Sequence, residues 1–396
     1  MSSSTSRPFR PSRLLQSIPP YVFWDLEGRK AAHREAGRTL LDLGIGSPDQ
    51  PVPAEVLAHC TEAVARRELS RYPHFRGHPE LFGAFAEYAA ERFGIALDPT
   101  REMLSVAGSK EGLTEVVLAV CEPGDVVLIP AIYYPVYVRA TQLAGAEPVF
   151  VPFRDDGSLD LDAIPPALLA RARVLIANYP CNPTTATLDL AGVERLVAFA
   201  QQHGLLLISD LAYAELGFDG YRAPSALEVP GALDCTVELH TASKSFCMAS
   251  FRVGLVVGNA DVLNALDVYR TNTGYGNASL PQIAAAAAFR AHARIVPPIV
   301  AEYQARRDAL VEALRAGGWQ VNAPRATMYL WLPVPEGFDD WQWVEHCMAH
   351  HGVVVTPGSA FGEAGQGRFR ISLVQPPEQL REAAHALTRA ASGALA

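Results

Sequence analysis

Two strand-like runs flank a polar turn in the stretch Val237-Glu-Leu-His-Thr241-Ala-Ser-Lys244-Ser-Phe-Cys-Met-Ala-Ser-Phe-Arg252-Val-Gly-Leu-Val-Val-Gly258. Along the chain, short apolar runs of this kind alternate with helical patterns. Strands that alternate with helices form a mostly parallel sheet covered on both faces, so an α/β fold is predicted. Such sheets bind ligands beyond the carboxyl ends of their strands. The strand-ending residues Asn178, Asp210 and Thr241 are therefore candidates for a site. Similar short apolar runs alternate with helical patterns towards the N-terminus: Val126–Pro130, Pro148–Phe153, Val174–Asn178 and Leu205–Asp210.

The pattern changes near residue 288. A long charged helix is predicted over Glu302–Ala316, followed by short strands around Met328–Leu332 and Phe369–Val374. We therefore expect a large domain over residues 55–288. A smaller α+β domain, built from both chain ends, should comprise residues 1–54 with an N-terminal arm and residues 289–396.

The composition limits the classes of function. The chain has 396 residues, 49% of them hydrophobic and 19% charged, with a net charge of −9, which favours a globular small-molecule enzyme over a protein that binds nucleic acid or anionic membranes. No apolar run approaches the roughly 18 residues of a membrane span, and Met1–Ser12 lacks the apolar stretch of a signal peptide. We expect a cytoplasmic protein. The six cysteines show no Cys-x-x-Cys spacing, so no disulfide framework or zinc ribbon is predicted.

Lys244 follows Thr241-Ala-Ser at the end of a strand, and Arg252 stands shortly after it. A lysine amine in this position can form a Schiff base with an aldehyde, while the hydroxyls and the guanidinium suit a phosphate dianion. Taken alone, Ser-Lys on a loop is more often an ordinary solvated lysine.

Asp210 ends the apolar run Leu205–Asp210, and Tyr213 follows it. A carboxylate there can keep a ring nitrogen protonated, which makes the ring an electron sink. The alternative is that Asp210 simply caps a helix, because Asp is a preferred N-cap residue.

Two further segments carry polar groups, and each has an ordinary structural reading. Asn178-Tyr-Pro-Cys-Asn182-Pro-Thr reads as a turn, and Gly108-Ser109-Lys110-Glu-Gly112 precedes a helical pattern whose N-terminus would attract phosphate. The second segment lacks the spacing of a Walker loop. His346, Cys347, His350 and His351 have metal-ligand chemistry, but no second cluster accompanies them and no metal is expected.

In this order the motifs resemble those of fold-type I pyridoxal-phosphate enzymes of the class I/II aminotransferases, and within them the LL-diaminopimelate aminotransferase-like proteins. The resemblance extends from Leu14 to Ala391. It is carried by Leu-Gln-Ser-Ile-Pro-Pro-Tyr-Val-Phe near the start, Asp-Leu-Gly-Ile-Gly-Ser-Pro-Asp at 42–49, Gly-Ser-Lys-Glu-Gly, Tyr134-Pro-Val-Tyr, Asn-Pro-Thr, Ser-Asp-Leu-Ala-Tyr, Ser-Lys-Ser-Phe-Cys-Met and Phe-Arg370-Ile-Ser.

The resemblance implies pyridoxal 5′-phosphate (PLP) as cofactor, with three catalytic residues. Lys244 would carry it as a Schiff base and, once displaced, would move the proton from the substrate α-carbon. Asp210 would pair with the pyridine nitrogen. Tyr213 and Asn182 would hydrogen-bond the phenolic oxygen of the ring, and Tyr134 would stack on the ring face.

The resemblance also implies how the two anionic groups are held. Arg370 would clamp the substrate α-carboxylate bidentately, with Asn182 and the backbone near Gly46 beside it. Tyr72 would reach the cofactor from the neighbouring subunit of a homodimer. The cofactor phosphate would be bound by Ser109, Lys110, Thr241, Ser243 and Arg252.

Four departures from the relatives concern the substrate more than the reaction. Ser47 stands where the relatives usually have Asp, Ser250 where they have Gly, Tyr133 replaces a small residue, and the segment 270–277 differs. We expect amino transfer between an L-amino acid and a 2-oxoacid by a ping-pong route, with LL-diaminopimelate or a related amino acid as donor. The alternatives are another PLP reaction on the same scaffold, such as β-elimination, and a non-catalytic PLP-binding protein.

Overall fold

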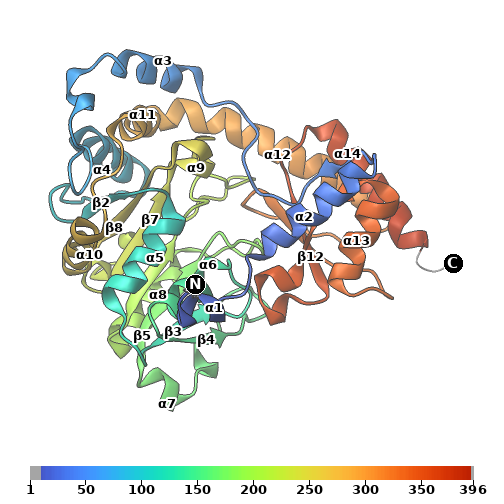
Figure 1. The fold of residues 1–396 in the computed structure, drawn as a ribbon, viewed down its shortest axis with the longest axis horizontal. Coiled ribbons are helices and arrows are strands. Elements are labelled where there is room, and N and C mark those ends of the chain that lie inside the picture. The colour runs from blue at the N-terminus through green and yellow to red at the C-terminus, as the bar shows by residue number, and fades with distance from the viewer. Residues whose placement is uncertain (1–9, 394–396) are drawn as a thin grey trace, which may run out of the picture.

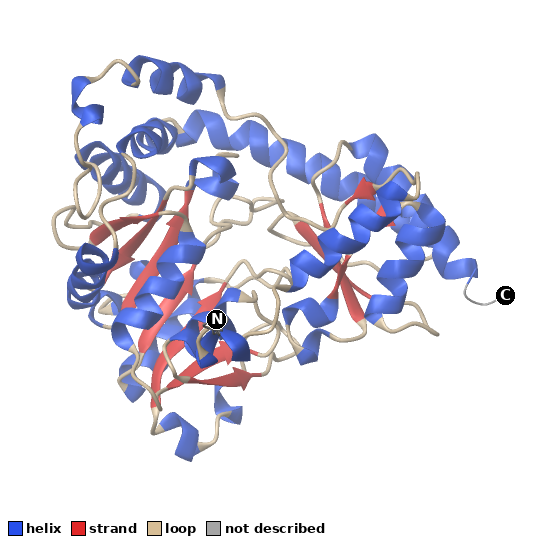
Figure 2. Ribbon diagram, in the orientation of Figure 1, coloured by secondary structure: helices blue, strands red, loops and turns tan. Residues whose placement is uncertain are grey.

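The computed structural model describes residues 10–393, so residues 1–9 of the predicted N-terminal arm lie outside the described residues. A seven-stranded sheet forms the centre of the larger part of the molecule (Figures 1 and 2). Its strands, in spatial order, are β2 (Met103–Val106), β8 (Gly254–Gly258), β7 (Thr236–Thr241), β6 (Leu206–Asp210), β5 (Ala172–Asn178), β3 (Val126–Pro130) and β4 (Glu147–Val151).

Five of these strands, from β7 to β4, run parallel, whereas β8 is antiparallel to both of its neighbours. The strands read as continuous apolar runs because both faces of the sheet are buried. Within β6, for example, Leu207 and Ile208 are both fully buried but belong to cores on opposite faces. The predicted α/β fold with a mostly parallel sheet is confirmed.

Helices cover the two faces in two groups. One core packs α5 (Ser109–Val120), α6 (Val136–Leu143) and α10 (Ala260–Thr273) against the sheet. The opposite core contains α4 (Pro79–Phe93), α8 (Leu190–His203) and α11 (Ser279–Arg290). The alanines of α11 from Ala284 to Ala286 are fully buried, as expected of a tightly packed helix.

A smaller pair of sheets lies beside the large one, at the right of Figure 1. The first has the order β11 (Thr356–Pro357), β12 (Arg368–Ser372), β9 (Tyr329–Pro333). In the second, β1 (Leu41–Asp42) from the N-terminal part pairs in parallel with β10 (Val353–Val354). Both chain ends therefore contribute to this region, while the exact domain boundaries at residues 54 and 288 stay a prediction.

The remaining helices connect and cover these sheets. They are α1 (Arg13–Ser17), α2 (Val22–Glu35), α3 (Ala54–Ala63), α7 (Pro166–Leu169), α9 (Ala242–Ser245), α12 (His292–Ala316), α13 (Asp340–His351) and α14 (Pro377–Gly393). Among the described residues, no single helix is long and apolar enough to cross a membrane; α11 and α12 meet the criteria only together, as a pair bent by 84°.

Helix α12 begins well before the predicted start at Glu302. Pro297 and Pro298 lie inside it, and each lacks the N–H that an interior helical residue donates. Ile295, Val296 and Ile299 are nevertheless buried around the prolines. The predicted start at Glu302 is therefore wrong, because burial of these apolar side chains outweighs the tendency of proline to interrupt a helix.

Candidate active site

A cavity of about 400 Å³ opens at the carboxyl ends of β5, β6 and β7. Every residue predicted for the site lines it except Tyr72. The predicted lining residues are Gly46, Ser109, Lys110, Tyr134, Asn178, Asn182, Asp210, Tyr213, Thr241, Ser243, Lys244, Arg252 and Arg370.

Lys244 lies in the single-turn helix α9, directly after β7. Its Nζ donates to the carbonyl oxygen of Gly46, which comes from the N-terminal part of the chain. Burial lowers the pKa of Lys244 below its ordinary value, and the positive charges of Arg370 and Arg252 lower it further, while Tyr329 opposes the shift. The lysine thus has an amine that loses its proton more readily than a solvated one.

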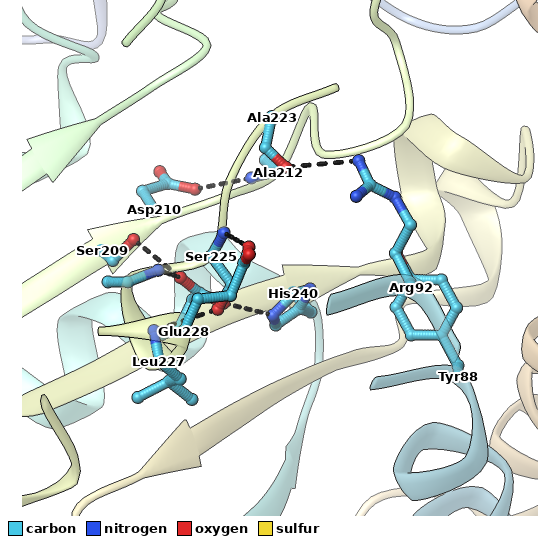
Figure 3. Close-up of polar contacts among 12 residues, drawn as sticks. Tyr88, Arg92, Ser209, Asp210, Ala212, Ala223, Ser225, Leu227, Glu228 and His240 are labelled. Atoms are coloured by element: carbon cyan, nitrogen blue, oxygen red, sulfur yellow. Dashed lines mark hydrogen bonds and ion pairs between the residues drawn. The ribbon is translucent and has the colours of Figure 1, made fainter. Parts of the chain in front are cut away.

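Asp210 is buried at the end of β6 and holds two hydrogen bonds. Its carboxylate accepts from the Tyr137 hydroxyl at 2.7 Å and from the Ala212 N–H at 3.3 Å; Figure 3 shows the second bond. Burial raises the pKa of this carboxyl, and both donors oppose the rise. A turn rather than a helix follows Asp210, so the helix-cap reading does not apply. A cationic partner in the cavity would favour the ionised form.

Arg370 reaches the cavity from β12 and is only 2% exposed. Its Nη1 donates to Asn182 Oδ1 at 2.8 Å and its Nη2 to the Gly44 carbonyl at 2.8 Å. Among residues 10–393, its buried Nε has no hydrogen-bond partner. A guanidinium that lines a cavity and has an unpartnered donor is suited to bind a carboxylate.

A further group of donors in the cavity lining suits a phosphate. Ser109 is the first residue of α5, where the helix leaves backbone N–H groups free. Thr241 and Ser243 are buried beside it, with hydroxyl oxygens 2.9 Å apart. Arg252 adds a guanidinium, which is fixed by bonds to the carbonyls of Ala107 and Ala249 at 2.8 and 3.0 Å.

This set of residues fits PLP, the cofactor that the fold family implies. The helix start, two hydroxyls and a guanidinium match a phosphate dianion, Asp210 can pair with a ring nitrogen, and Lys244 supplies an amine. The unpartnered Nε of Arg370 is a further donor that these contacts leave unused.

Tyr72 is the predicted site residue that the cavity does not include. Its side chain is 81% exposed and packs on Tyr275 with ring centroids 4.7 Å apart. In a single chain it therefore lies outside the site.

The structure adds lining residues for which the sequence indicated no role. Tyr137 belongs to the Tyr134-Pro-Val-Tyr motif, so its presence there could have drawn attention to it. Tyr329 lies within the predicted strand Met328–Leu332, but only its pairing with the Arg370 strand places it in the site. The complete set is Tyr21, Phe23, Ile45, Tyr137, Ala212, Ala249 and Tyr329.

A second polar cluster lies behind the sheet, on the face opposite Asp210. The fully buried carboxylate of Glu238 accepts hydrogen bonds from the Ser209 and Ser225 hydroxyls, the Ala226 N–H and His240 Nε2, at 2.6 to 3.0 Å. Ser209, Ser225 and His240 are labelled in Figure 3. Since all these donors meet one carboxylate, the cluster fixes β6 against β7.

His346, His350 and His351 lie close together on α13, with ring centroids of His346 and His350 5.0 Å apart. Over residues 10–393, no three His, Cys, Asp or Glu side chains are grouped so that they could hold a metal ion.

The sequence profile of the family described as aminotransferase class I and II matches residues 38–387. The chain belongs to this family, and it is an enzyme that transfers an amino group between an amino acid and a 2-oxo acid. The predicted family and reaction are confirmed.

Several individual proteins are similar to this chain over nearly its whole length. The chain is 40% identical to the LL-diaminopimelate aminotransferase of Dehalococcoides mccartyi (strain ATCC BAA-2266 / KCTC 15142 / 195), over 94% of this chain and 96% of the relative. The substrate-bound structure of BacF from Bacillus subtilis has a TM-score of 0.93 at 31% identity, covering 97% and 98% of the two chains. A probable N-succinyldiaminopimelate aminotransferase from Thermus thermophilus has a TM-score of 0.89 at 36% identity, covering 93% and 100%.

Proposed function

We propose that this aminotransferase uses PLP bound in the cavity, with Lys244 as the point of covalent attachment. The observation that carries the proposal is the meeting of Lys244, Asp210 and Arg370 in one cavity, although they come from three different elements. Ser109, Lys110, Thr241, Ser243 and Arg252 would hold the phosphate. When bound, the cofactor ring would take up the electrons left on the substrate α-carbon after that carbon loses its proton.

The residues of the chain have separable tasks around the α-carbon. Arg370 would bind the α-carboxylate of the amino acid with its free Nε and its Nη groups, which fixes the orientation of the substrate. The lowered pKa of Lys244, caused by burial, favours the neutral amine that can accept a proton from the α-carbon. Asp210, when ionised, would stabilise positive charge on the ring nitrogen.

We further propose LL-diaminopimelate as the amino donor, in keeping with the relatives of that name. The residues that depart from the relatives do not line the cavity of this chain. Tyr133 stacks on Phe150, with centroids 5.4 Å apart, and both Ser47 and Ser250 are exposed outside the cavity. Arg270 is buried and donates to Asn277 at 2.7 Å, so a hydrogen bond joins the two ends of the altered 270–277 segment.

The enzyme would act as a homodimer with shared sites. Tyr72, Phe75 and Tyr275 form an exposed aromatic cluster, 81%, 48% and 43% exposed respectively, and this cluster would be covered by the partner. Exposed aromatic clusters of this kind are characteristic of protein interfaces.

A panel of amino donors tests the function and the substrate together. LL-diaminopimelate, glutamate, aspartate, alanine, methionine and aromatic amino acids would each be added to PLP-loaded enzyme, and the visible absorbance of the bound cofactor followed. The true donor should abolish this absorbance and release one oxo acid per site. Oxo acid released over many turnovers without an acceptor would indicate elimination, and a response to glutamate but not to LL-diaminopimelate would refute the proposed donor.

A further inference from the structure

Tyr329 on β9 lies inside the site, although none of the roles described above includes it. Its side chain is buried, and its hydroxyl oxygen is 2.9 Å from the hydroxyl oxygen of Tyr213. The two rings meet nearly edge to face, with centroids 5.7 Å apart and an interplanar angle of 74°. This geometry is that of a buried hydrogen bond between two phenols.

The backbone holds these two tyrosines in register. The Thr327 N–H donates to the Leu216 carbonyl at 2.8 Å, and the Phe218 N–H donates to the Arg325 carbonyl at 2.8 Å. Gly217 and Ala326 form an antiparallel bridge between these bonds. These backbone bonds join the turn that contains Tyr213 to the segment that leads into β9. The backbone therefore keeps the two hydroxyl groups close to each other.

Tyr329 also contacts the residues around the substrate carboxylate. The Arg370 guanidinium lies 4.2 Å from the centre of its ring, and Tyr329 pairs with Ser372, two positions along β12 from Arg370. A Cβ atom on Gly46 would overlap the Tyr329 hydroxyl, so that position has room only for glycine. One side chain therefore touches Tyr213, Arg370 and Gly46.

We propose that Tyr329 is a positioning residue whose hydroxyl donates to the Tyr213 oxygen, which leaves the Tyr213 proton free to be donated to the ring oxygen of the bound cofactor. The inference rests on the proposed PLP function. A phenol that accepts one hydrogen bond becomes a stronger donor in the next, because successive hydrogen bonds polarise one another. Tyr329 would thus strengthen the contact that Tyr213 makes.

Other groups that can titrate or carry charge face this pair and must be held constant in any test. Burial raises the pKa of the Tyr213 phenol well above its ordinary value, so the Tyr213 hydroxyl keeps its proton through the neutral range. Arg370 on β12 lowers this pKa, and Tyr134, which precedes α6, raises it. Burial lowers the pKa of Lys244 in α9, and Tyr329 raises it.

The test is a double-mutant cycle of Tyr329→Phe and Tyr213→Phe, read from the pH midpoint of the visible absorbance of PLP bound to the whole protein. A donor to the ring oxygen favours the deprotonated chromophore, so its loss should raise the midpoint. Tyr213→Phe should raise it by about 1–2 pH units, the worth of a hydrogen bond to a charged group. Tyr329→Phe should raise it by a few tenths of a unit, and should add nothing in the Tyr213→Phe background.

Tyr303→Phe is the matched control, because the Tyr303 hydroxyl is also buried and has no partner among the described residues. It should leave the midpoint unchanged. An equal shift from Tyr329→Phe in both backgrounds, or no shift while Tyr213→Phe shifts the midpoint, would overturn the inference. Should Tyr329→Phe fail to fold, Tyr329→Met, which removes the hydroxyl while its flexible side chain fills the buried space, replaces it in the cycle. A wild-type protein that gains no visible absorbance with PLP contradicts the proposed function itself, and the inference falls with it.

Discussion

Lys244 and Lys110 both line the cavity, so the attachment point can be tested directly. Lys244→Ala should still bind PLP through the phosphate donors, but borohydride should no longer fix the cofactor covalently, because the amine is missing. Lys110→Ala is the control: at saturating PLP it should still be labelled at Lys244, although the lost phosphate contact should weaken PLP binding. Mass spectrometry of the reduced protein gives the answer, and a PLP-labelled peptide that persists in Lys244→Ala would assign the attachment to another lysine.

The lowered pKa of Lys244 predicts how its reactivity depends on pH. Burial favours the neutral amine, so covalent capture of PLP by the cofactor-free protein should rise with pH and reach half its maximum below pH 10.5, the ordinary value of a lysine. The sign follows because the protonated form, which dominates below the lowered pKa, cannot attack an aldehyde. Stopped-flow absorbance measures the rate; an inflection at or above 10.5 would mean that Lys244 behaves as a solvated lysine.

At the scale of elements, the start of α5 should control the affinity for the cofactor. Gly108 has φ 91°, and a Cβ there would overlap the Arg252 guanidinium. Gly108→Ala should therefore displace Arg252 and raise the Kd for PLP roughly tenfold, the loss expected for one charge-assisted hydrogen bond. Fluorescence titration of the cofactor-free protein measures this Kd.

Gly124→Ala separates the displacement of Arg252 from backbone strain. Gly124 has a similar φ of 97°, but nothing lies within 4 Å of a Cβ built there. It should lose stability by about 1–3 kcal/mol, like any residue forced into this conformation, yet keep its affinity for PLP. If both substitutions weaken PLP binding equally, the role given to Arg252 is wrong.

At the scale of the whole molecule, the isolated chain leaves Tyr72 outside the site, and a dimer would supply it from the partner. Lys244→Ala chains co-refolded with Tyr72→Phe chains should regain activity at limiting PLP, although each parent is nearly inactive. In the heterodimer, one site combines both defects while the other has an intact Lys244 and an intact Tyr72. Heterodimers that form without any recovery of activity would falsify the shared site, and a monomer in gel filtration would exclude it.

The residues that local pattern identifies are those for which one short segment contains the whole signal. Lys244 and Arg252 flank a turn between two apolar runs, Asp210 ends a strand, and Ser109 precedes a helical pattern. Because the carboxyl ends of parallel strands share one edge of a sheet, this alternation by itself implies that such residues converge. The α/β fold and the cavity lining around the proposed phosphate site could therefore be predicted without coordinates, whereas the family was predicted from the resemblance of the motifs.

Other features of the site and of the fold depend on tertiary structure and could not be predicted from the sequence. Tyr329 and Tyr213 are far apart in sequence, and only the pairing of β9 with β12 and the bridge at Gly217 bring their hydroxyls together. Helix α12 continues through Pro297 and Pro298, although proline tends to end a helix, because the side chains around them are buried. The sequence determined which groups lie at the strand ends, because that is a local property of the chain. Which side chains from distant segments complete the site depends on packing, which no single segment encodes.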